Sequence, residues 1–178
     1  DAAGGGQHDD DDDDDSADAL RSLLAMTDAP LVGGVKDGGH TLIISGDLVT
    51  NADLAAVVQT HIRARAACTV ALSRSSIPSG PNFTPHVHVI ADPSGSRLLG
   101  IVEDGELDGS MLRVRTSLLR RYPTLAVRAD LKDPHVYIFA PWTLQTLLPT
   151  LPQVSSVRLD LVPYLARRQF TLSKQLQQ

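Results

Sequence analysis

The sequence contains few aromatic residues and almost no cysteine. Phe, Trp and Tyr make up 4% of the 178 residues, so the core is expected to consist of Leu, Val, Ile and Ala. Cys68 is the single cysteine, which excludes an internal disulfide and a zinc site built from several cysteines. No apolar stretch approaches the roughly 18 residues of a membrane span, so a membrane partner is not expected.

Apart from a single acidic run, the sequence also has no large excess of positive or negative charge. Residues 9–15 are seven consecutive aspartates, which account for the net charge of −5. The remaining acidic residues and the 16 basic residues nearly balance, so neither a strong positive field nor a strongly acidic surface is left. Direct binding to nucleic acid is therefore not predicted.

The same acidic run divides the chain. Like charges in residues 1–15 repel each other and offer nothing to bury, so we predict a disordered acidic segment there. Calcium binding is the alternative, although a flexible run lacks a fixed cage of ligands. Residues 16–172 are predicted to belong to one domain, and residues 173–178 to form a tail. Because the pattern of elements starts and stops in mid-domain, we expect an incomplete piece of a larger domain.

Alternating helical and strand patterns predict an α/β fold. Ser16 is placed to cap a helix that runs to about residue 26, and Asn51 to cap a helix over residues 52–66. Residues 41–45 and 68–72 are short apolar runs of the kind found in buried parallel strands. A strand, a helix and a strand in this order form a βαβ unit, which predicts a mainly parallel sheet flanked by helices.

The second half of the chain predicts antiparallel excursions from that sheet. The turn Asp92-Pro-Ser-Gly95 predicts a hairpin between the strands on either side of it. A helix is predicted to begin at Pro141, and Ser155 or Ser156 to cap a last helical segment that Pro163 must kink or restart. The strands predicted in this half cover residues 86–91, 97–102, 125–129 and 135–140.

Asp47 is the strongest candidate for chemistry, at the end of the stretch Ile43-Ile-Ser-Gly-Asp47. Ligands of open α/β sheets bind beyond the carboxyl ends of the strands, where a carboxylate can hold a divalent metal that bridges phosphate oxygens. The alternative is that Asp47 stabilises its own turn with a hydrogen bond. Since no further carboxylate ligand is identifiable nearby, the spacing alone slightly favours the structural role.

His86 and His88 lie two residues apart on a predicted strand, so both point to one face and are spaced to bind zinc. No third or fourth ligand is in view, which favours a polar, solvent-facing side with Val87 and Val89 turned inward. Cys68 is interpreted as a small buried hydrophobic residue rather than a nucleophile.

Arginine pairs at residues 120–121 and 167–168, and Arg63 with Arg65, are suited to contact RNA or an acidic protein. Without stacking aromatic residues between them, a partner-facing or solvated surface is favoured over RNA. Ser45 and Ser73 have no patterned histidine partner, so a hydrolase triad is not predicted.

Two blocks of sequence resemble a known family. The helix SADALR at residues 16–21 and the stretch LIISGDLVTNADLAAVVQTH at residues 42–61 are similar to the nucleotidyltransferase core of the sugar-nucleotide pyrophosphorylases. DPHVYIF at residues 133–139 and SSVRLDLVPYLARRQF at residues 155–170 resemble a non-catalytic branch, the gamma subunits of eukaryotic translation initiation factor 2B. The resemblance covers roughly residues 16–170, and its last block is the most specific.

The resemblance implies a nucleotidyltransferase-like, Rossmann-like sheet and a cytosolic protein of translation initiation. It implies a non-catalytic subunit of the guanine-nucleotide exchange factor for initiation factor 2, whose partners are the epsilon-type and other subunits of initiation factor 2B and initiation factor 2 itself. Asp47 would be the magnesium position of the family, left as a vestige, and no cofactor is expected. Val157, Leu161, Tyr164 and Leu165 are predicted to pack on the domain or a partner, with Arg158, Arg167 and Arg168 outside.

The alternative within the same family is an active sugar-nucleotide pyrophosphorylase similar to mannose-1-phosphate guanylyltransferase, with magnesium as its cofactor. A lone binding domain of this fold, outside any factor complex, is a third interpretation. The Glu-Lys-Pro motif of the family's sugar site is missing, since residues 98–110 read LLGIVEDGELDGS. Asp47 alone cannot support phosphoryl transfer, because that chemistry requires several charge-neutralising groups.

Overall fold

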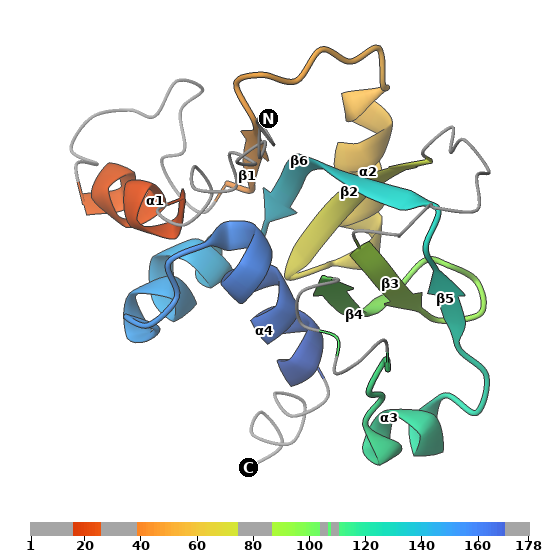
Figure 1. Ribbon diagram of the computed structural model, residues 1–178. Coiled ribbons are helices and arrows are strands. Elements are labelled where there is room, and N and C mark those ends of the chain that lie inside the picture. Colours follow the sequence, from red (N-terminus) through yellow and green to blue (C-terminus); the bar gives the residue numbers. More distant parts are fainter. Residues whose placement is uncertain (1–15, 26–38, 75–86, 104–106, 108–110, 170–178) are drawn as a thin grey trace, which may run out of the picture.

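The computed structural model describes residues 16–25, 39–74, 87–103, 107 and 111–169 (Figure 1). The predicted acidic segment at residues 1–15 and the predicted tail at residues 173–178 lie outside these ranges, as does His86. No helix in the described ranges has both the length and the apolar character that a membrane crossing requires.

The first sheet has three strands in the order β1-β6-β2. Its central strand β6 (Leu131–Phe139) pairs antiparallel with β1 (Thr41–Ile44) on one side and with β2 (Cys68–Arg74) on the other. Both Thr41 and Cys68 lie opposite Phe139, so the two outer strands begin level with each other.

The second sheet is also antiparallel and has the order β4-β3-β5. β3 (Val87–Ala91) and β4 (Leu98–Glu103) form the predicted hairpin, in which Asp92 accepts the backbone N–H of Arg97 and Gly95 adopts φ 71°. β5 (Ala126–Arg128) pairs with the other edge of β3. The chain then passes from β5 into β6, which joins the two sheets (Figure 1).

The prediction of a mainly parallel, Rossmann-like sheet is wrong. β1, the helix α2 (Leu54–Ala64) and β2 follow one another as predicted, and β1 and β2 run in the same direction. They do not pair with each other, because β6 lies between them and is antiparallel to both. All strand pairing in the described ranges is antiparallel. In place of the expected parallel β1–β2 pair there are two antiparallel pairs, because β6, which is distant in sequence, pairs with both strands.

The first residues of the helices differ in part from the predicted boundaries. The predicted cap Asn51 is wrong: Asp53 caps α2, and its carboxylate accepts the backbone N–H of Ala56 at 3.0 Å. α1 runs from Ser16 to Ala25, so Ser16 is its first residue and not the residue before it, as the predicted cap would be. A short helix that the sequence did not predict, α3 (Thr116–Arg121), precedes β5.

The last described elements form a C-terminal helical block, residues 141–168. It comprises a π-helical turn Thr143–Leu147, a 3₁₀ turn Leu148–Thr150, a second π-helical turn Val157–Leu161 and the helix α4 (Val162–Arg168). Pro163 lies in the first turn of α4, so the predicted kink or restart falls where the π turn passes directly into an α-helix.

The core is aliphatic, as predicted, and lies where the two sheets meet the C-terminal helical block (Figure 1). Val87, Val89 and Ile101 enter it from the second sheet, and Tyr137 and Phe139 from the first. Within the described residues, eight of the fourteen buried members of this cluster come from the C-terminal helical block: Leu144, Leu148, Leu151, Val154, Val157, Leu161, Val162 and Leu165.

The central strand β6 contains a bulge at Asp133-Pro-His135. The register against β2 shifts here, from Ala71 opposite Val136 to Ser73 opposite Lys132. Pro134 has no N–H to give to a neighbouring strand and is tolerated inside a sheet only at such an irregularity. His135 adopts φ 57°, a left-handed conformation that is uncommon for a residue with a side chain, and its N–H is satisfied by the Asp133 carboxylate at 2.8 Å.

The bulge yields a test of backbone strain. We expect His135→Val to lower the free energy of unfolding by about 1–3 kcal/mol more than His135→Asn, because a β-branched residue tolerates positive φ far less well than Asn. Both variants lose the imidazole and its contacts, so their difference in urea denaturation isolates the backbone term. Equal midpoints for the two variants would contradict a left-handed residue 135.

Candidate functional site

Asp47 lies in an exposed turn directly after β1. Its carboxylate accepts a hydrogen bond from the Ser45 hydroxyl, and the backbone N–H of Leu48 closes the turn onto the Ser45 carbonyl. The Ser45 bond, with help from the backbone N–H of Asp47, holds the pKa of Asp47 below its ordinary value. In this geometry Asp47 therefore stabilises its own turn, which is the structural role that the spacing allowed.

The described residues around Asp47 supply few companions for a metal. Ser45 donates its backbone N–H to the carbonyl of His135, which brings the bulge of β6 next to the turn. No group of three or more His, Cys, Asp or Glu side chains in the described ranges is arranged to hold a metal ion. A lone exposed carboxylate provides a single ligand, whereas Mg²⁺ and Ca²⁺ require several oxygen ligands around them.

The other predicted candidates fall at separate places. Val87 and Val89 on β3 are buried, as the alternation predicted, whereas His88 between them is half-buried and not solvent-facing. Its Nδ1 is shielded from solvent and has no hydrogen-bond partner among the described residues. Cys68 begins β2 and packs against the core, and Ser73 is exposed near the end of the same strand. Cys68 is thus placed as a small core residue.

A polar network that the sequence did not predict surrounds the β6 bulge. The Asp133 carboxylate accepts the His135 backbone N–H and, at 2.7 Å, the hydroxyl of the buried Tyr137. Arg158 forms an ion pair with Glu103 at 2.7 Å and approaches the His135 ring at 3.5 Å. The network ties β6, β4 and the C-terminal helical block together, and a proline within a strand-like run was the sequence signal for it.

A buried histidine was also missed. His61 on α2 is fully buried, and its ring nitrogens contact the Thr69 hydroxyl at 2.7 Å and the His40 ring at 2.9 Å. Burial, together with the neighbouring His40, lowers the pKa of His61. The three side chains fasten α2 to β2 and to the residue before β1, so they hold the first sheet and its helix together.

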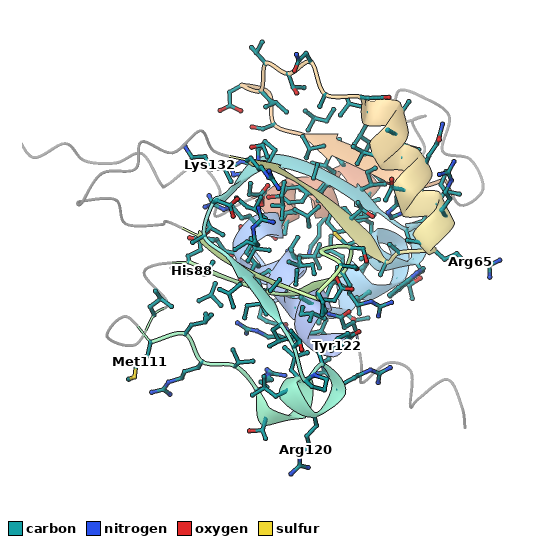
Figure 2. All side chains as sticks on the ribbon, turned by 90° about the vertical axis from the view of Figure 1, so that its right-hand side faces the viewer. Arg65, His88, Met111, Arg120, Tyr122 and Lys132 are labelled. Carbon is teal, nitrogen blue, oxygen red and sulfur yellow. The ribbon has the colours of Figure 1, made fainter. Side chains whose placement is uncertain are left out.

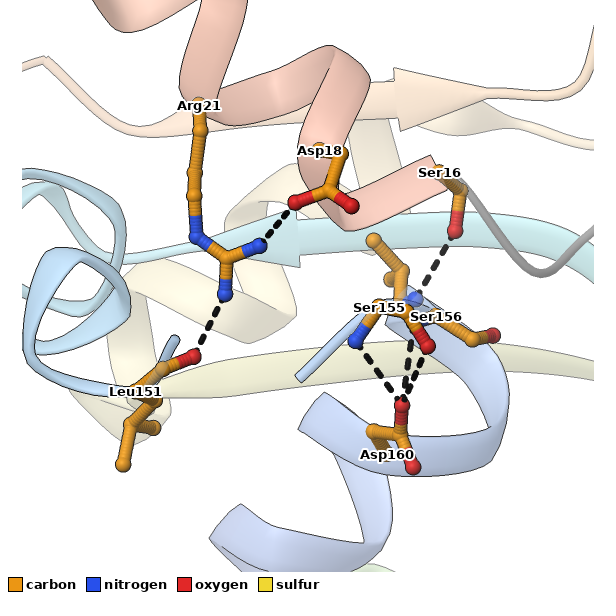
Figure 3. Close-up of polar contacts among 8 residues, drawn as sticks. Ser16, Asp18, Arg21, Leu151, Ser155, Ser156 and Asp160 are labelled. Carbon is orange, nitrogen blue, oxygen red and sulfur yellow. Dashed lines mark hydrogen bonds and ion pairs between the residues drawn. The ribbon is translucent and has the colours of Figure 1, made fainter. Parts of the chain in front are cut away.

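The start of the second π-helical turn is capped reciprocally (Figure 3). Ser156 is buried, and its hydroxyl accepts the Leu159 backbone N–H at 3.0 Å. The Asp160 carboxylate reaches back to accept the backbone N–H groups of Ser155 and Ser156, at 2.9 and 3.1 Å. This resembles a capping box, lengthened from three residues to four by the π turn. Burial of Asp160 opposes its ionisation, but the bonds from Ser156 and Ser155 outweigh it and lower the pKa of Asp160.

α1 docks onto the same point from the other end of the chain (Figure 3). Ser16 accepts the Val157 backbone N–H at 2.8 Å, and Ala17, itself fully buried, donates its backbone N–H to the Ser155 carbonyl at 2.7 Å. Arg21 pairs with Asp18 on α1 and donates to the Leu151 carbonyl at 2.5 Å. The first described helix is therefore fixed to the C-terminal helical block by backbone-directed bonds.

Packing of the most specific block follows the prediction for most of its residues. Val157, Leu161 and Leu165 are buried, Tyr164 is half-buried, and Arg167 and Arg168 are exposed. Arg168 lies over the Tyr164 ring at 5.4 Å. The placement of Arg158 on the outside is wrong, because its ion pair with Glu103 holds it half-buried.

Comparisons with known proteins indicate a relation over part of the chain. No protein-family model matches the chain. A curated relative, translation initiation factor eIF2B subunit gamma of Schizosaccharomyces pombe (strain 972 / ATCC 24843), is 35% identical over 78 residues. That stretch is 44% of this chain and 17% of the relative, so the chain matches far less than two thirds of it. The similarity supports a relation to this initiation-factor subunit over the matched stretch.

The capping carboxylate provides a test of the C-terminal helical block. We expect Asp160→Ala to lower the free energy of unfolding by about 2 kcal/mol, because two buried backbone N–H groups lose a charged acceptor. The folded pKa is lowered, so this contribution is present above the unfolded pKa and is lost as the pH falls through the folded pKa.

Chemical denaturation of Asp160→Ala at neutral and acidic pH checks this, with Asp130→Asn as the matched control. Asp130 forms a more exposed pair with Arg128, so its removal is expected to lower the free energy of unfolding by clearly less. Equal losses in both variants, or a loss for Asp160→Ala that persists at low pH, would contradict the capping role.

The thiol of Cys68 is predicted to be protected. Burial, with a smaller effect from the negative charge of Asp133, raises the pKa of Cys68, so little thiolate is present near neutral pH. We expect its reaction with a disulfide reagent at pH 8 to be at least about 100-fold slower in the folded chain than in urea. Comparable rates in the two states would show that Cys68 is accessible.

Proposed function

We propose that the chain is part of a gamma-type subunit of eukaryotic translation initiation factor 2B and acts in translation initiation in the cytosol. The observation that carries this proposal is the 35% identity to the gamma subunit of the fission yeast factor. The sequence blocks at residues 133–139 and 155–170 support it from the residues themselves. The proposal does not depend on a nucleotidyltransferase fold.

The proposed role is non-catalytic: the chain assembles with an epsilon-type subunit and the other subunits of the factor, and takes part in binding initiation factor 2. No cofactor is required for this role. Two charged groups of the block at residues 155–170 are engaged in internal contacts, Asp160 in capping and Arg158 in the pair with Glu103. Such groups shape a binding surface by fixing the backbone rather than by reacting.

We place the association with the epsilon-type subunit at the free edge and outer face of β1. Leu42 and Ile44 are two residues apart, so they project from the same face, and they are 39% and 40% exposed. Among the described strands β1 pairs with β6 alone, and its other edge is proposed to pair with a strand of another chain. Exposed apolar side chains beside an unpaired strand edge are suited to subunit contact.

Co-purification tests the proposal. A tagged form of this chain, co-expressed with the epsilon-type subunit of the same factor, is expected to retain that subunit on an affinity resin. The variant Leu42→Ser/Ile44→Ser should reduce recovery at least about tenfold, because it removes the apolar contact of the edge strand. Val127→Ser on β5, 49% exposed, is the matched control and should leave recovery unchanged.

Two outcomes would overturn the proposal. Failure to recover the epsilon-type subunit with the unaltered chain, while the fission yeast gamma subunit recovers it under the same conditions, would remove the assignment. Magnesium-dependent release of pyrophosphate from a nucleoside triphosphate and a sugar phosphate, lost on Asp47→Asn, would contradict the non-catalytic role.

A further inference from the structure

A groove of about 550 Å³ lies between β4, residues 113–118 and α4. Its floor is aliphatic: Ile90, Leu99 and Ile101 come from the second sheet, and Leu118 from α3. The other wall is formed by two small, buried residues of α4, Pro163 and Ala166. The groove is thus wide enough for aliphatic side chains and lined to receive them.

The wall formed by α4 is held in place. α4 packs along β4, and beyond its end Gln169 donates from its side-chain amide to the Leu98 carbonyl at 2.8 Å. Gly100 leaves room at the floor, where an added Cβ would approach the Ile90 side chain at 3.3 Å. The groove is therefore a preformed feature of the packed second sheet and α4, and a ligand would not have to order these elements on binding.

Arginines surround this aliphatic floor. Arg113, Arg115 and Arg167 line the groove, and all three are exposed. A smaller hollow of about 210 Å³ shares Arg113, Arg167 and Val102 with it and extends the surface to the exposed Met111. An extended ligand can thus pass from one hollow to the other between two guanidinium groups.

One stretch that supplies the rim, from Met111 to Ala129, is rich in arginine. Between Ser110 and Asp130 the chain contains Arg113, Arg115, Arg120, Arg121 and Arg128 but no Asp or Glu. Among the described residues, Arg115 and Arg167 have no hydrogen bond or ion pair to an acidic side chain. As far as the described residues show, Arg115 and Arg167 therefore present positive charge beside an apolar floor.

We propose that this groove binds an acidic peptide segment of a partner protein, whose aliphatic side chains enter the floor while its carboxylates pair with Arg115 and Arg167. Carboxylates match the planar guanidinium group with paired hydrogen bonds. None of the described residues that line the two hollows is aromatic, so they provide no stacking platform of the kind that single-stranded nucleic acid uses. The groove and its charges belong to this chain alone and do not depend on the assembly proposed above.

Fluorescence anisotropy with the full 178-residue chain tests this binding. The probe is a short fluorescein-labelled peptide of alternating Glu and Leu. Two companion peptides replace Leu with Ser or Glu with Gln, and a labelled single-stranded oligonucleotide completes the set. We expect the Glu-Leu peptide to bind, and each companion probe to bind about tenfold more weakly or not at all. Added salt should weaken binding, because the contacting charges are exposed.

Matched variants locate the site. Arg115→Gln/Arg167→Gln should weaken binding about tenfold, whereas Arg65→Gln/Arg120→Gln, which removes the same charge, should not change it. Figure 2 shows Arg65 and Arg120 pointing away from the body of the molecule at different places. Ser117→Glu places a carboxylate in the groove at an exposed position and should abolish binding. Thr116→Glu, its exposed neighbour outside the groove lining, should have no more than a small effect.

Several results would overturn the proposal. These are tighter binding of the oligonucleotide than of the Glu-Leu peptide, equal binding of the Leu-to-Ser peptide, or equal losses in the groove and control variants. A tenfold gain in affinity when the aspartates of residues 9–15 are replaced by serines would assign the groove to this chain's own acidic run instead. Unchanged circular dichroism in every variant ensures that a loss reflects the site, and co-purification with the epsilon-type subunit is scored separately.

Discussion

Burial of one apolar side of the C-terminal helical block is the interaction on which the rest of the structure depends. In the part of the chain that the structure describes each sheet has three strands, and sheets this small need another layer to be stable. The block supplies that layer for both, because its leucines and valines meet Val89 of one sheet and Phe139 of the other. Full burial of each such side chain contributes about 1.5–3 kcal/mol, so this one segment provides much of the hydrophobic stabilisation.

A layer that joins two sheets must also satisfy its own backbone, and here that constraint brings distant parts of the chain together. The backbone N–H groups at the start of the second π turn have no acceptor within that helical stretch. Ser16, Ser156 and Asp160 accept hydrogen bonds from three of them. Ser16 and Val157 are separated by 141 positions in sequence. Packing and capping thus act on the same short stretch, residues 155–161, within the most specific block of the sequence.

Local features could be predicted from the sequence, and long-range pairing could not. Alternation and β-branched runs gave the positions of β1, β2 and the β3–β4 hairpin, because they depend on neighbouring residues. The insertion of β6 between β1 and β2 depends on residues far along the chain, so the parallel sheet was wrong. Of the candidate site, Asp47 and its turn were located, but the network of Asp133, Tyr137 and Arg158 arises only once the bulge of β6 faces the C-terminal helical block.

The same packing determines which side chains remain exposed and able to contact partners. Because the apolar side of the C-terminal helical block is used internally, Arg167 is left at its outer side, where it meets Arg113 and Arg115 across the groove. The exposed Leu42 and Ile44 lie on β1, at the opposite end of the molecule from α3 in both Figure 1 and Figure 2. A subunit paired to the edge of β1 would therefore leave the basic groove open. Two chemically different surfaces on one small scaffold would allow a lasting apolar contact with a subunit and, at the same time, a salt-sensitive contact with an acidic peptide.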